Sequence, residues 1–249
     1  MAKEKMVALD KVYKSKKIEK QQFNYNKNFD KRPSWIKAQL DKNIVFIKIL
    51  VDGEAFWYRN IFGDYFLILE PNENDIEIFY DSIAKEYDDL VPQNIEIGKF
   101  VVKKLKEYKI NENSEILELC AGTGIVASEL HKSGYKNITL IDLSEEELKL
   151  AKKRIPSAIT KKANVLELNL NKKYKVVFES MGFDSFKGKE LKSLLINIYN
   201  HLEENGIFVS VDRHIPKEFE QQFSKIEKGN FSLNTPKGNF RYDYFIGKR

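Results

Sequence analysis

Two glycines follow an apolar stretch near the middle of the chain, in the segment ILELCAGTGIVASEL at residues 116–130. Gly122 and Gly124 would let the backbone turn sharply and leave room for a ligand, because glycine has no Cβ. Residues with the pattern of a helix follow directly after them, so the first backbone N–H groups of that helix would point at the ligand. The segment is therefore typical of a ligand-binding loop between a strand and a helix.

A carboxylate follows this loop at the end of the next apolar stretch, ITLID at 138–142. Asp142 can accept hydrogen bonds from both hydroxyls of a ribose, and ligands of open α/β sheets bind at the carboxyl ends of the strands. The loop and Asp142 together indicate an adenosine-containing cofactor. The loop also fits the dinucleotide fingerprint G-x-G-x-x-A, which is weak alone. Glu118 argues against NAD, because a carboxylate there is badly placed for a pyrophosphate and well placed for a cationic amino-acid group.

The elements that must position these residues alternate between strand and helix. Such alternation over short loops predicts a mostly parallel, seven-stranded sheet with helices on both faces. Residues 231–247 read as an antiparallel hairpin that closes the sheet. We expect strands at 115–119, 138–142, 162–167, 175–180 and 206–211, and helices at 76–90, 94–108, 124–133, 144–154 and 188–203.

The first part of the chain has a different pattern. Three runs rich in β-branched and aromatic residues, 44–51, 55–61 and 65–70, are separated by Gly-containing turns and predict a small antiparallel β-meander. A short helix is expected at 34–41. The sequence thus divides into an N-terminal arm with this helix (1–43), the meander (44–75) and a cofactor-binding domain (76–249).

Composition narrows the class of protein. The 249 residues are 42% hydrophobic and contain a single cysteine, Cys120, and three histidines, which argues against a disulfide framework or a metal site. No apolar run approaches the ~20 residues that span a bilayer, and the charged N-terminus lacks the apolar core of a secretory signal. We therefore expect a cytoplasmic protein.

The N-terminal arm is basic. Residues 1–43 contain twelve Lys or Arg and five Asp or Glu, a local balance of +7. Such an arm either docks an acidic partner such as RNA or remains a solvated tail.

ILELCAGTG resembles the glycine-rich motif of class I S-adenosylmethionine-dependent methyltransferases. The segments 138–154, 162–168, 174–186 and 202–212 are similar to the later motifs of this Rossmann-like family in the same order, and 79–90 resembles the helix before the loop in small-molecule members. The resemblance covers about 170 residues. It implies a methyltransferase fold, S-adenosylmethionine as cofactor, and transfer of a methyl group to O or N of an acceptor, favouring a small molecule over RNA or protein.

The resemblance also implies roles for single residues. Asp142 would bind the ribose, Asn164 and Val165 would meet the adenine, and Tyr80 and Tyr87 would cover the cofactor. This chain departs from the family at Cys120, where glycine is frequent, and at Asn164, where aspartate is commoner. The remaining cofactor-binding candidates are Glu118, Leu119, Cys120, Ala121, Gly122, Thr123, Gly124, Leu143 and Glu179.

Two residues are candidates for catalysis, Glu179 after the fourth strand and His214 after the fifth. Either would act as a base, which is needed only when the acceptor carries a proton that must be removed. Alternative roles are open for both: Glu179 as a hydrogen-bonding group, His214 as a surface residue. Cys120 is expected to fill the loop rather than to act as a nucleophile.

Overall fold

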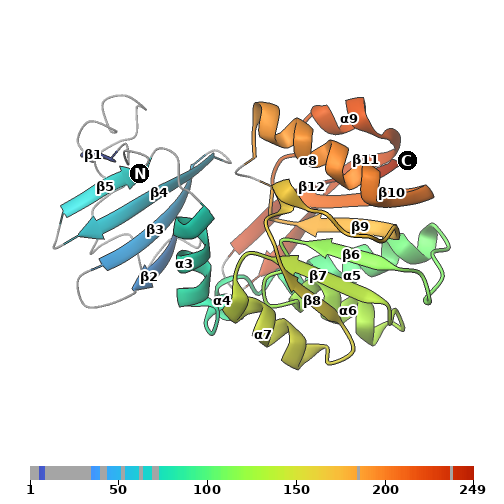
Figure 1. Cartoon of the computed structure of the whole chain (residues 1–249), viewed down its shortest axis with the longest axis horizontal. Helices are drawn as coiled ribbons and strands as arrows, with labels where there is room; N and C mark the ends of the chain where they lie inside the picture. The colour runs from blue at the N-terminus through green and yellow to red at the C-terminus, as the bar shows by residue number, and fades with distance from the viewer. Residues whose placement is uncertain are drawn as a thin grey trace. The chain divides into compact units, whose positions relative to one another are not determined.

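A computed structural model describes the backbone of residues 6–8, 35–39, 44–51, 54–61, 64–68, 73–183, 186–235 and 238–249. The chain forms two compact units, residues 1–83 and residues 84–249 (Figure 1). The compact units meet after residue 83, whereas the predicted domain boundary follows residue 75, and helix α3 (Glu73–Ile83) belongs to the first unit. Within the described residues, no helix is both long enough and apolar enough to cross a bilayer.

The first unit contains an antiparallel sheet in the order β1-β5-β4-β3-β2. The meander is present as predicted, in β3 (Ile44–Val51), β4 (Glu54–Ile61) and β5 (Asp64–Ile68). The helix predicted at 34–41 is wrong, because β2 (Trp35–Gln39) pairs with β3 along its whole length, from Trp35↔Ile49 to Gln39↔Val45. Strand β1 (Met6–Ala8) pairs with β5, and the rest of the basic arm lies outside the described residues.

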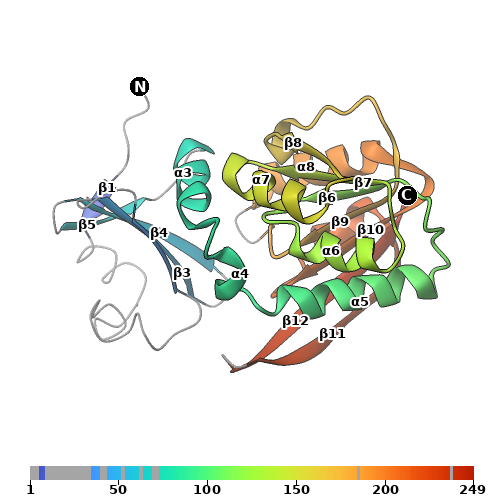
Figure 2. The ribbon, with the colours of Figure 1, turned by 90° about the horizontal axis from the view of Figure 1, so that it is seen from below.

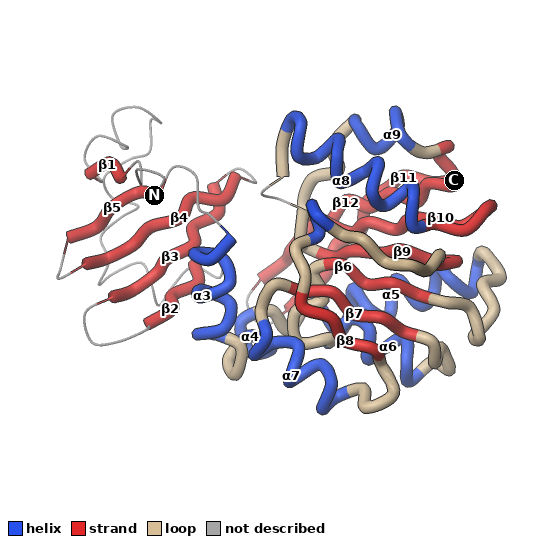
Figure 3. Tube along the Cα trace, in the orientation of Figure 1, coloured by secondary structure: helices blue, strands red, loops and turns tan. Residues whose placement is uncertain are grey.

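The second unit contains the predicted seven-stranded sheet, in the order β11-β12-β10-β9-β6-β7-β8 (Figure 3). The five strands from β10 to β8 in this order are parallel, and β12 and β11 close the sheet as an antiparallel hairpin. The predicted fold is confirmed. The strands are β6 (Ile116–Leu119), β7 (Ile138–Asp142), β8 (Ile159–Lys162), β9 (Tyr174–Ser180), β10 (Leu202–Asp212), β11 (Ser224–Thr235) and β12 (Gly238–Lys248).

Helices cover both faces of this sheet (Figure 2). Alternate side chains of each strand point to opposite faces, so Val176 and Phe178 pack in one apolar cluster with α5, α6 and α7, while Val177 packs in the other with α8 and α9. The helices are α4 (Tyr87–Leu90), α5 (Asn94–Glu107), α6 (Ile125–Lys132), α7 (Glu145–Arg154), α8 (Gly188–His201) and α9 (Glu218–Gln222), with a 3₁₀ turn η2 (Val165–Glu167).

Two further predicted boundaries are wrong. The single helix expected over 76–90 is divided into α3 and α4 by a turn at 84–86, where the first unit gives way to the second. The strand expected over 162–167 lies earlier, as β8, which forms a mostly exposed edge of the sheet beside β7. Its polar sequence, ITKK, gave a weaker apolar signal than the segment that follows it.

Candidate functional site

The predicted ligand-binding loop lies between β6 and α6. Cys120, Gly122 and Gly124 have φ angles of 52°, 51° and 68°, in the left-handed region. The loop is fixed to the next strand by a hydrogen bond from the Ala121 N–H to the Ile141 carbonyl (3.0 Å) and closes on itself through the Gly124 N–H and the Ala121 carbonyl (2.9 Å). The chain therefore reverses within five residues and enters α6 at the carboxyl end of β6.

Glycine is required at Gly124 for space as well as for conformation. A Cβ added there would lie 2.9 Å from the Cβ of Ala151 on α7, closer than real Cβ contacts. At Gly122, an added Cβ would lie 3.3 Å from Oε2 of Glu147 and 3.5 Å from Cε1 of Tyr87. The loop thus packs tightly against α7, with the Tyr87 ring beside it.

Asp142 connects the loop to the end of β7. Its Oδ2 accepts the Gly122 N–H (2.8 Å) and its Oδ1 accepts the Ser144 N–H (2.9 Å). Ser144 in turn caps α7 by accepting the Glu147 N–H at 3.1 Å. Asp142 therefore fixes the loop and the start of α7 to the end of β7.

Glu118 is a buried carboxyl group on β6, only 1% exposed. Burial raises the pKa of Glu118 well above its usual range, and the charges of Asp142 and Glu179 raise it further, whereas a hydrogen bond from the Ala127 backbone lowers it. Its Oε2 has no hydrogen-bond partner among the residues that the structure describes. A buried carboxyl oxygen without a partner is costly, and a cation bound beside it would remove this cost.

Asn164 and Val165, the residues predicted to meet the adenine, lie next to the end of β7. The Ala163 N–H donates to the Asp142 carbonyl (3.0 Å), which brings Asn164 and Val165 to this edge of the sheet. Asn164 is not in a strand: its Oδ1 accepts the Leu166 N–H (2.9 Å) and caps η2. One acceptor position of the amide oxygen is therefore used within the protein, and Val165 is buried in the core.

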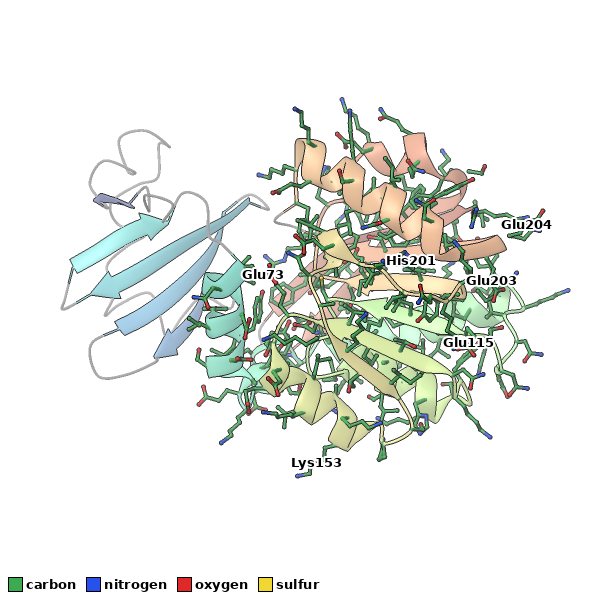
Figure 4. All side chains as sticks on the ribbon, viewed as in Figure 1. Glu73, Glu115, Lys153, His201, Glu203 and Glu204 are labelled. Atoms are coloured by element: carbon green, nitrogen blue, oxygen red, sulfur yellow. The ribbon has the colours of Figure 1, made fainter. Side chains whose placement is uncertain are left out.

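The structure brings most of the candidates together at the carboxyl ends of β6 and β7. The opposite edge of the sheet carries Glu115, just before β6, and Glu203, near the start of β10 (Figure 4). Tyr80 lies on α3, in the unit of residues 1–83, and its role remains a prediction. The candidates in and around the loop are Tyr87, Glu118, Leu119, Cys120, Ala121, Gly122, Thr123, Gly124, Asp142, Leu143, Asn164 and Val165.

The two catalytic candidates lie in different settings. Glu179 is fully buried; its Oε1 accepts the Ser210 hydroxyl and its Oε2 accepts the Gly182 N–H at 3.1 Å. This favours the hydrogen-bonding role for Glu179, which fixes Gly182 two residues after the end of β9. His214 is exposed in the bend after β10. A role as base remains a prediction for both.

Sequence reasoning missed a polar network beside the loop. Thr123 Oγ1 donates to Asp88 Oδ1 at 2.5 Å, and the guanidinium of Arg154 donates to both the Asp88 carboxylate and the Thr123 carbonyl. Asp88 and Arg154 lie 66 residues apart in the chain. No motif links them, so only the folded structure reveals the contact.

Comparisons with known proteins find methyltransferases. Residues 116–206 match a family model described as a methyltransferase domain. The malonyl-[acyl-carrier protein] O-methyltransferase of Bacillus anthracis is 30% identical over 107 residues, 42% of this chain and 39% of that protein. The demethylmenaquinone methyltransferase of Leptospira interrogans is 28% identical over 146 residues, 53% of this chain and 58% of that protein. The chain therefore matches between about two fifths and three fifths of the length of these curated relatives.

Solved structures show the same fold. Magnesium protoporphyrin IX methyltransferase of Synechocystis, solved with bound S-adenosylmethionine, superposes with a TM-score of 0.58 at 12% identity, covering 73% of this chain and 99% of that one. The predicted resemblance to class I S-adenosylmethionine-dependent methyltransferases is confirmed.

Proposed function

We propose that this chain, which carries a methyltransferase domain over residues 116–206, transfers a methyl group from S-adenosylmethionine to an oxygen or nitrogen atom of a small molecule. The observation that carries the proposal is the loop at 120–124, tied to Asp142 by the hydrogen bond from Gly122 (2.8 Å). A glycine-rich loop after one parallel strand, with a carboxylate at the end of the next strand, is the arrangement that binds a nucleoside cofactor.

The residues present fit this cofactor. Asp142 would accept the ribose hydroxyls, and Gly122 would admit the cofactor close to the backbone. Asn164 would face the adenine edge. Glu118 is buried, and one of its oxygens has no partner within the described part of the chain. It would lie near the cationic amino-acid part, where a positive charge lowers its pKa and favours its ionised form.

The protein's contribution to the reaction is mainly positioning. When bound, S-adenosylmethionine supplies a methyl group already activated by its positive sulfur. Glu179 fixes the loop after β9 through Gly182, and this loop would hold the acceptor in line with that methyl group. For an acceptor that must lose a proton, His214 is the proposed base.

Two considerations support a small-molecule acceptor in the cytoplasm. The relatives named above are described by their names as acting on malonyl-[acyl-carrier protein] and demethylmenaquinone. The chain has one cysteine in 249 residues, as is common in a reducing compartment. The basic balance of residues 1–43 favours a second candidate, an RNA or protein acceptor docked through residues 1–70.

A labelled-methyl transfer assay separates these candidates. The full chain and an Asp142→Asn variant are incubated with labelled S-adenosylmethionine and, separately, with pools of small molecules, peptides and RNA. We expect label in the small-molecule pool with the wild type, reduced at least tenfold by Asp142→Asn. Label in the RNA or peptide pool alone would support the second candidate instead. Absence of transfer to every pool, together with no binding of S-adenosylhomocysteine, would contradict the proposed function.

A further inference from the structure

Helix α4 lies beside the cofactor loop. It is four residues long, and none of its residues is buried. A single helical turn is not stable by itself in water, because the nucleation of a helix is unfavourable. Its position next to Gly122, where Tyr87 lies 3.5 Å from the place of an added Cβ, therefore depends on contacts with the rest of the domain.

Asp88, the second residue of α4, makes two such contacts. One carboxylate oxygen of Asp88 accepts the Thr123 hydroxyl at 2.5 Å, and the other accepts Arg154 Nη2. Thr123 is 1% exposed and lies between the two glycines of the loop. Asp88 thus fastens α4 directly to the loop that would bind the cofactor.

Arg154 completes the connection from the other side. It is the last residue of α7 and donates through Nη1 to the Thr123 carbonyl and through Nη2 to Asp88. Its neighbour Lys153 points away from the sheet into solvent (Figure 4). The planar guanidinium reaches two acceptors in fixed directions, which the single ammonium group of lysine does not do.

We infer that Asp88 and Arg154 are positioning residues that hold Tyr87 against the cofactor loop and so slow the departure of the cofactor. This inference rests on the proposed function and adds to it a residue pair that controls cofactor retention. The pair is about one-third exposed on each side, 29% for the Arg154 side chain and 34% for Asp88. An exposed salt bridge alone contributes little, but this pair also makes hydrogen bonds between charged groups and Thr123, so we expect changes of roughly tenfold rather than complete loss of binding.

The test measures how fast radiolabelled S-adenosylhomocysteine leaves the full-length protein after addition of excess unlabelled compound. Arg154→Gln and Asp88→Asn should each raise the dissociation rate by about tenfold, and the double variant should raise it no further, because both changes break one connection. Arg154→Lys should have the same dissociation rate as Arg154→Gln, because the planar guanidinium with its two donor nitrogens is needed, and a positive charge alone is not sufficient. The association rate should change by less than about threefold.

A matched control is Lys149→Gln. Lys149 lies on the same helix and pairs at the surface with Glu145 and Glu146, so this variant removes one positive charge from α7 without touching the loop. Its dissociation rate should equal that of the wild type. In a Tyr87→Ala background, Arg154→Gln should have no further effect, which distinguishes retention through Tyr87 from a general loss of structure.

The possible outcomes distinguish a failure of the positioning role from a failure of the proposed function. Equal dissociation rates in wild type, Arg154→Gln and Asp88→Asn would overturn the positioning role and leave the proposed function intact. An undiminished effect of Arg154→Gln in the Tyr87→Ala background would also overturn it. Failure of the wild-type protein to bind S-adenosylhomocysteine would instead overturn the proposed function, and the inference with it.

Discussion

Replacing Gly124 by alanine tests the geometry of the cofactor loop without any ligand. The φ angle of Gly124 is 68°, and an alanine in the left-handed region costs about 1–2 kcal/mol. The added Cβ would also lie 2.9 Å from the Cβ of Ala151 and 3.3 Å from its Cα. Overpacking of this kind costs about 1–3 kcal/mol. We therefore expect Gly124→Ala to lower the free energy of unfolding of the domain by about 2–5 kcal/mol.

Gly188→Ala provides the matched control. Gly188 also has a positive φ, 56°, but nothing lies within 4 Å of an added Cβ. Among the described residues nothing crowds this position, so its replacement should cost only the conformational part, about 1–2 kcal/mol. The difference between the two variants isolates the contact between the loop and α7.

The assay must report on the second unit. Both tryptophans, Trp35 and Trp57, belong to the unit of residues 1–83, so tryptophan fluorescence is unsuitable. Hydrogen exchange of the buried amides of β7, such as those of Leu140 and Ile141, measures the opening free energy of the sheet itself. If Gly124→Ala lowers the opening free energy by no more than Gly188→Ala does, the tight packing of the loop on α7 is refuted.

Three further predictions concern other buried or charged groups. Burial raises the pKa of Glu118 in the free protein and a bound cation lowers it, so binding of S-adenosylmethionine should release a proton, and the affinity should rise with pH between these two pKa values. Glu118→Gln should abolish this proton release, which calorimetry in buffers of different ionisation enthalpy detects. Glu227→Gln should lower stability by about 1–3 kcal/mol at neutral pH. Burial alone would raise the pKa of Glu227, but hydrogen bonds from Lys104, Tyr244 and Tyr108 lower it to about 2. The stabilisation is therefore present above the ordinary glutamate pKa of 4.5 and is lost as the pH falls towards 2, as acid titration of the unfolding free energy would show. Ser144→Ala should lower the free energy of unfolding, measured by urea denaturation, by about 1 kcal/mol, because it removes the N-cap of α7.

The parts of the fold that follow from local patterns were predictable from the sequence. Strand β7 was predicted with the observed bounds, because ITLID is apolar and ends at a carboxylate. The loop was predicted from its glycines, and the closing hairpin from the extended runs at the end of the chain. Each of these signals lies within one short segment.

Features that depend on distant pairing were not predictable. The segment WIKAQ contains helix-favouring residues, yet it forms β2 because β3 offers a full set of partners. The contact of Lys104 with Glu227 joins residues 123 positions apart, and that of Asp88 with Arg154 joins residues 66 apart. The burial of Glu179 was likewise not visible, because a carboxylate at the end of a strand reads as an accessible group.

The most direct test of the proposed cofactor site is calorimetric titration of the full chain with S-adenosylhomocysteine. The comparison uses the wild type, Asp142→Asn, and Asp243→Asn as a control that removes a carboxylate paired with Arg241 on β12. We predict binding of one ligand by the wild type and by the control. Asp142→Asn should bind about 30-fold more weakly, the equivalent of about 2 kcal/mol for charge-assisted hydrogen bonds to the ribose. Equal affinity in wild type and Asp142→Asn, or no heat in the wild type, would contradict the proposed site.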